Sequence, residues 1–106
     1  MDWTQEITGT HVVGRPVGRV DESTWEQFSE RLIGAVRDAA AAGLPLVVDL
    51  AALDYMSSRG LRALTMAKRE AGEAVAITLA APNARMREIL AISRYDKLFV
   101  IADDVG

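Results

Sequence analysis

The sequence predicts a single small α/β domain over residues 1–106, in which helices pack on a mixed, mainly parallel sheet. Apolar runs typical of strands alternate along the chain with segments whose apolar residues recur every three or four positions, as in amphipathic helices. The length of 106 residues suits one domain, and a hydrophobic content of 50% can build its core without metal or disulfide. Two strands at the start, then helix and strand in alternation, give the expected order ββαβαβαβ.

Two strands open the chain. A short one is expected around residues 3–7, and it pairs with a longer one over residues 11–20. The longer segment contains Gly14, Pro16 and Gly18, which are typical of an edge strand or a bulged strand.

The first helix is predicted from an apolar stripe. Ser23 and Glu26 have the spacing of a capping box at its start, and Gly43 and Pro45 end it. Because the stripe faces the core, its aromatic residues are expected to pack there rather than to stack on a ligand. The stripe consists of Trp25, Phe28, Leu32, Val36, Ala39 and Ala40.

The central strand is expected over residues 46–50, a continuous apolar run with one acid that is typical of a strand covered on both faces. A second helix follows Ser57 and Ser58 and ends near Gly72. A further strand is predicted over residues 74–79.

Pro82 and Asn83 open a third helix whose apolar positions are Met86, Ile89, Leu90 and Ile92, and a last short strand covers residues 98–101.

Composition argues against several classes of partner. Twelve Lys and Arg against 15 Asp and Glu give a net charge of −3, so nucleic acid and anionic lipid are not expected to bind. The longest apolar stretch is interrupted by Pro45 and Asp49, and it falls short of the ~20 residues of a membrane span. The absence of cysteine and of a signal-peptide pattern at the N-terminus favours the cytoplasm.

Few residues indicate enzymatic chemistry. His11 has no serine or acid at a spacing that suggests a catalytic triad. Asp49 ends the central strand and Asp54 follows five residues later, where a metal ion or a phospho-aspartate is conceivable, but capping of turns is the favoured interpretation. Asp21 and Glu22 match the acidic pair of a receiver domain only weakly. We expect no cofactor, no metal and no catalytic residue.

The segment that enters the second helix is the strongest functional candidate. Ser57 and Ser58 lie where free backbone N–H groups and the helix dipole tolerate an anion. Phosphorylation of Ser58 would place about −1.5 to −2 charges beside Arg59 and Arg62, and Gly60 leaves room for a partner. The alternative is that Ser57 simply caps the helix and Ser58 is exposed.

The chain resembles a STAS domain of the bacterial anti-sigma factor antagonist family. The most specific part is the segment Asp49–Leu61, above all Asp54-Tyr55-Met56-Ser57-Ser58-Arg59-Gly60-Leu61. Supporting matches are Gly18-Arg19-Val20-Asp21 before the first helix and Tyr95-Asp96-Lys97-Leu98-Phe99 after the third.

The resemblance implies a STAS-like fold and a non-enzymatic role in partner switching. The unmodified antagonist would bind an anti-sigma factor that is a serine/threonine kinase, phosphorylation would break the complex, and a PP2C-type phosphatase would restore it. By position in the motif, Ser58 is the phosphorylation site, with Ser57 possible. The partner-binding residues implied are Asp21, Ser57, Ser58, Arg59, Gly60 and Arg62.

Two positions differ from the family motif and keep other functions open. Ser57 stands where the family usually has aspartate, and Arg59 stands where a small residue is common. One alternative is a STAS subunit that docks constitutively on a transporter ATPase or a sensory assembly without phosphorylation. An enzyme with a metal held by Asp49 or Asp54 is the third hypothesis.

Overall fold

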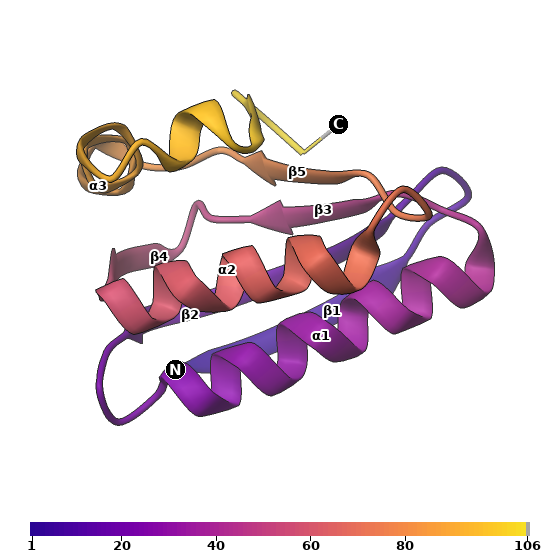
Figure 1. Ribbon diagram of the computed structural model, residues 1–106, viewed down its shortest axis with the longest axis horizontal. Coiled ribbons are helices and arrows are strands. Elements are labelled where there is room, and N and C mark those ends of the chain that lie inside the picture. The colour runs from indigo at the N-terminus through magenta and orange to yellow at the C-terminus, as the bar shows by residue number, and fades with distance from the viewer. Residues whose placement is uncertain (106) are drawn as a thin grey trace.

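The computed structural model describes residues 1–105, and Gly106, the last residue of the expected domain, lies outside the described residues. The predicted alternation of strands and helices is confirmed, and one short strand and one 3-10 turn are added to it (Figure 1). The elements are β1 (Asp2–Ile7), β2 (Val12–Val20), α1 (Trp25–Ala42), β3 (Leu46–Asp49), β4 (Leu53–Met56), α2 (Ser58–Ala71), β5 (Ile77–Ala80), α3 (Ala84–Ile92), the turn η1 (Tyr95–Lys97) and β6 (Val100–Ala102).

The sheet is mixed and mainly parallel, as expected. Its order is β1-β2-β3-β5-β6, and β4 pairs with β2 beyond the end of the β2–β3 pairing. Among the strands within residues 1–105, only β1 and β2 pair in antiparallel fashion, and the other pairs are parallel. The carboxyl ends of β2 and β4 therefore lie side by side, with Val20 opposite Met56.

The sequence predicted an edge strand or a bulged strand for β2, and the second alternative is confirmed, because β2 is bulged and does not lie at the edge. The register shifts between Gly18 and Arg19, and β2 has β1 on one side and both β3 and β4 on the other. Pro16 is tolerated because the pairing with β3 ends at Gly14 and the pairing with β4 begins at Gly18. Its missing N–H therefore falls in a gap of the ladder.

Helices α1 and α2 lie side by side over one face of the sheet, and the core fills the space between them and the strands (Figure 1). In β3, Leu46 and Val48 are buried, whereas Val47 and Asp49 are only half-buried. Because side chains alternate along a strand, the second face of β3 is partly open. The expectation that this strand is covered on both faces is therefore wrong.

The start of α1 differs from the capping box expected from Ser23 and Glu26. Thr24 is the N-cap residue, and its side chain makes no capping hydrogen bond. Its hydroxyl instead donates to the carbonyl oxygen of Arg19 at 2.8 Å. At the other end, Gly43 ends the helix as predicted, in a left-handed conformation with φ of 67°.

The boundaries of the later elements follow the sequence closely. Helix α2 begins after Ser57 and ends before Gly72, and Asn83 caps α3, as predicted. Strands β5 and β6 begin later than expected, at Ile77 and Val100.

Candidate functional site

The structure brings the two predicted parts of the site together at one end of the sheet. The backbone N–H of Ser57 donates to the carbonyl oxygen of Val20 at 2.8 Å, which joins the start of α2 to the end of β2. Asp21 follows β2 directly, and so its turn lies beside the first turn of α2. The ion pair between Arg59 Nε and Glu22 Oε2, 3.5 Å apart, links the same two segments.

Asp21 organises the turn that leads into α1. Its Oδ1 accepts hydrogen bonds from the hydroxyl of Ser23 at 2.8 Å, the backbone N–H of Ser23 at 3.0 Å and the hydroxyl of Thr24 at 3.2 Å. These donors, the Ser23 hydroxyl first among them, hold the pKa of the Asp21 carboxyl below its ordinary value. The carboxylate therefore stabilises the turn in its charged form.

Ser57 and Ser58 have different environments although they are neighbours. Ser57 is 8% exposed, and its Oγ accepts a hydrogen bond from the backbone N–H of Gly60 at 3.3 Å, so it caps α2. Ser58 is exposed and is the first residue of the helix. Of the two hydroxyls, the one on Ser58 is open to another protein.

Gly60 is buried, and the reason for a glycine here is core packing. A Cβ at this position would lie 2.5 Å from Met56 Cγ and 2.7 Å from Val20 Cγ1. The missing side chain therefore faces the sheet and lets α2 approach it closely. This replaces the expectation that Gly60 makes room for a partner at the surface.

Arg59 packs against the start of α1. Its guanidinium lies over the ring of Trp25, 5.3 Å from the centroid, in addition to its ion pair with Glu22. The sequence prediction for Trp25 was a core position, but this residue is half-buried and lies at the core boundary. Phe28, the other aromatic residue of the stripe, is fully buried as predicted.

Arg62 and Met66 separate two surface grooves. One, of about 390 Å³, runs between α1 and α2 and is lined by Trp25, Ser29, Arg59, Arg62, Ala63 and Met66. The other, of about 580 Å³, runs between α2 and the segment after α3 and is lined by Ser58, Leu61, Arg62, Thr65, Met66, Arg69, Ser93 and Tyr95. The sequence did not predict either groove, because each depends on how α2 packs against a distant segment.

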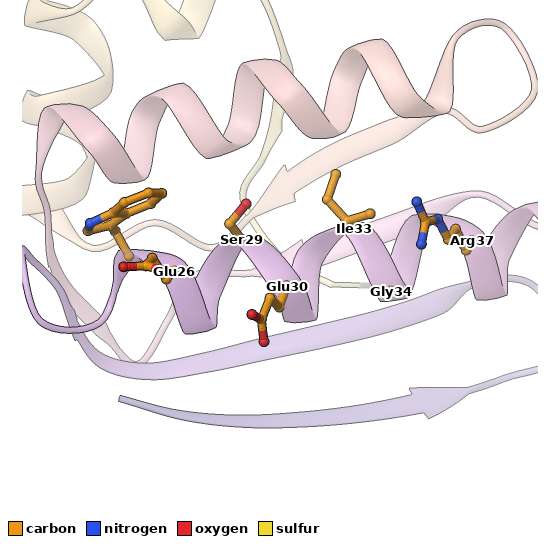
Figure 2. Close-up of a pocket in the computed structure, with 7 residues that line it drawn as sticks. Glu26, Ser29, Glu30, Ile33, Gly34 and Arg37 are labelled. Carbon is orange, nitrogen blue, oxygen red and sulfur yellow. The ribbon is translucent and has the colours of Figure 1, made fainter.

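A third depression runs along α1, and unlike the two grooves beside α2 it is lined by acids. It measures about 490 Å³, and its lining includes two acids, Glu26 and Glu30. Figure 2 shows Ser29 and Ile33 pointing toward α2, whereas Glu30 points away from it. Arg37 also lines it, and its Nη2 is 2.9 Å from Glu70 Oε1. The acids thus gather along α1, and the exposed cations of the site gather on α2.

Among the residues considered for metal or catalytic chemistry, Asp49 has clear structural contacts. Asp49 lies 3.3 Å from Arg15 Nε and accepts from the backbone N–H of Ala51 at 3.0 Å, which agrees with turn capping. Asp54 is exposed on β4, and His11 lies in the turn at the other end of β2. Within residues 1–105, no three His, Asp or Glu side chains are grouped as metal ligands. Nor does any helix there have the length and apolar content to cross a membrane.

The family model and the solved structures that match this chain indicate the same fold. Residues 3–101 match the family model described as Mlab, STAS domain. A search of curated proteins found no sequence match. Among solved structures, an anti-sigma factor antagonist from Mycobacterium paratuberculosis is 23% identical with a TM-score of 0.78, over 98% of this chain and 86% of that one.

The fold of this chain is also similar to that of SpoIIAA, in both its unphosphorylated and its phosphorylated form. The anti-sigma factor antagonist SpoIIAA in its unphosphorylated form is 21% identical, with a TM-score of 0.69 over 99% of this chain and 90% of that one. The Bacillus cell fate determinant SpoIIAA in the phosphorylated form is 22% identical, with a TM-score of 0.62 over 95% of this chain and 91% of that one.

Proposed function

The chain belongs to the STAS domain family, and on this premise we propose that it is an anti-sigma factor antagonist switched off by phosphorylation of Ser58. In its unmodified form it binds an anti-sigma factor that is a serine/threonine kinase. Phosphorylation by that kinase breaks the complex, and a PP2C-type phosphatase restores the binding form. No catalytic residue of this chain takes part.

The observation that carries the proposal is the contrast between the two serines. The Ser57 hydroxyl is used as the cap of α2 and is nearly buried, so its modification would remove a helix cap. Ser58 is exposed one residue later, where the free N–H groups and the dipole of α2 stabilise a phosphate. The contrast therefore favours Ser58 over Ser57 as the acceptor, because a phosphate on Ser58 would leave the cap of α2 in place.

The partner surface that we propose surrounds Ser58 at the joined ends of β2 and α2. Arg59 and Arg62 provide its exposed side chains, and the turn of Asp21 borders it. Ser57 and Gly60 lie beneath this surface and fix its shape. A phosphate added at such an interface introduces charge repulsion and a desolvation cost, and about 3 kcal/mol weakens a complex more than a hundredfold.

The first test of the proposal is binding to the kinase-type anti-sigma factors of the host. Ser58→Ala is expected to bind, and Ser58→Asp is expected to lose at least tenfold in affinity. The matched control is Ala84→Asp, which adds the same acid at the exposed first position of α3. Equal binding by both Ser58 variants would contradict the proposal.

The second test is the mass of the protein purified from its host, with and without phosphatase treatment. A phosphate on Ser58 that the phosphatase removes is the expected result. A protein that is unmodified under all growth conditions would favour the alternative below.

The alternative is a STAS subunit that docks constitutively on a transporter ATPase or a sensory assembly. It is favoured by Arg59, which stands where the family motif commonly has a small residue and whose side chain packs on Trp25. Transporter genes next to the gene for this chain would support docking, and a kinase or sigma factor gene would support switching.

A further inference from the structure

The exposed face of α2 carries positive charge that the fold does not neutralise. The cations of this helix are Arg59, Arg62, Lys68 and Arg69. Arg59 pairs with Glu22, and Lys68 donates to the carbonyl oxygen of Leu98 at 2.8 Å. Within residues 1–105, Arg62 and Arg69 have no acidic oxygen within 4.0 Å. Two unneutralised arginines on one helix are notable in a chain with a net charge of −3.

Both arginines line the groove between α2 and the segment after α3. They are seven residues apart, so they lie on the same face of the helix two turns apart. None of the eight lining residues is acidic, and the hydroxyls of Thr65 and Tyr95, 2.8 Å apart, join the two walls. Between the arginines lies Met66, which is 51% exposed.

These features suit one kind of occupant. Arginine and methionine are enriched in protein interfaces, where their apolar parts are covered and the guanidinium is paired. A groove with two free guanidiniums and an exposed thioether is complementary to carboxylates that flank an apolar side chain. Ser58 lines the same groove, so an occupant here continues the surface that we propose for the kinase partner.

We infer that this groove receives an acidic segment of the partner protein, with carboxylates on Arg62 and Arg69 and an apolar side chain on Met66. The inference rests on the proposed function, because it names the chemistry by which the same partner is recognised. Arg62 is four residues after Ser58 and faces it along the helix. A phosphate on Ser58 therefore pairs with Arg62 in place of the partner's carboxylate, and it repels the acidic segment.

A synthetic peptide, Glu-Glu-Leu-Glu-Glu-Leu-Glu-Glu, tests the groove without the partner. Amide chemical shifts are expected to change along α2 and near Ser93 and Tyr95, and the binding should weaken as salt is added. Arg62→Gln and Arg69→Gln should each weaken binding about two- to fivefold, the usual range for an exposed ion pair. Arg31→Gln, which removes an exposed arginine from α1, is the matched control and should bind normally.

Two further probes distinguish recognition of carboxylates on a peptide from general attraction between the arginines and any anion. A peptide with lysine in place of every glutamate should not bind, and a thymidine oligonucleotide of the same charge as the acidic peptide should bind less tightly. Equal binding of the oligonucleotide, equal loss in the Arg31 variant, or no shift changes on α2 would each overturn the inference.

The effect of Ser58 is tested on the same peptide. Ser58→Asp should weaken peptide binding, whereas Ala84→Asp should not. If the peptide binds as expected but Ser58→Asp still binds the anti-sigma factor, the groove stands and the phosphorylation switch fails. If the switch works but the peptide does not bind, the groove fails alone.

Discussion

Gly60 shows how one residue sets the position of the candidate site. Gly60→Ala would place a Cβ within 2.7 Å of atoms of Val20 and Met56, and both belong to the core. We expect the free energy of unfolding to fall by about 1–3 kcal/mol, the usual cost of overpacking. Urea denaturation at constant slope would measure it.

Gly34 provides the matched control for this change. It lies inside α1, and a Cβ there would meet nothing within 4 Å. Gly34→Ala should therefore stabilise the protein by about 0.5–1 kcal/mol through helix propensity. Adding Val20→Ala to Gly60→Ala should cost less than the sum of the two changes, because they act at one contact. Equal effects of the two glycine changes would contradict the packing role.

Asp21 gives a pH dependence that can be assigned to one residue. Its pKa is lowered in the folded protein by the Ser23 and Thr24 donors, relative to about 3.9 in an unfolded chain. A lowered pKa adds stability that is fully present above the unfolded value. This contribution is lost as pH falls through the folded value.

The prediction is that Asp21→Asn loses less stability than the parent protein between pH 6 and pH 3. The urea midpoint at each pH would show it. Asp54→Asn, at an exposed position on β4, is the control and should follow the parent curve. A parallel pH profile for Asp21→Asn would show that the turn does not depend on the charged carboxylate.

At the scale of elements, the features predicted correctly from the sequence are those that a local sequence pattern determines. The apolar stripes located α1, α2 and α3, and Gly43, Ser57 and Asn83 marked helix ends correctly. These signals are short-range, because a cap or a stripe is set by residues within a few positions.

Two errors among the elements have different physical causes. Strand β4 has only four residues, none of them β-branched, and it exists because it pairs with the part of β2 beyond the bulge. The start of α1 depends on the turn of Asp21, whose hydrogen bonds took the place of the expected capping box. The pairing of β4 joins distant segments and is not visible in a local window, whereas the turn of Asp21 is a local arrangement that competes with the capping box for the same residues.

The site was predicted in part for the same reason. The residues around Ser58 were located because the motif is contiguous in sequence. Trp25 under Arg59 and Tyr95 beside Thr65 were missed because they reach α2 from distant segments, 34 residues before Arg59 and 30 after Thr65.

At the scale of the molecule, the site is attached to the best-supported part of the sheet. In the described part of the chain, β2 pairs with three neighbours, β1, β3 and β4, whereas β6 at the edge pairs only with β5. The link from Ser57 to Val20 therefore ties the start of α2 to β2, the strand with the most neighbours. On the proposed function, a phosphate on Ser58 would therefore change the charge of the surface, and we expect the sheet beneath it to keep its structure.

Native-state hydrogen exchange tests this arrangement. The amides of Val12 and Gly18 in β2 donate to the carbonyl oxygens of Pro45 and Ala52, which directly precede β3 and β4, and they should exchange only through global unfolding. Amides of β6 should exchange at least about tenfold faster, because opening this edge strand breaks a single pairing. A Ser58→Asp variant should leave the β2 rates unchanged, since the added charge lies outside the core. Slower exchange in β6 than in β2, or a general loss of protection in the variant, would mean that the site and the sheet are not organised in this way.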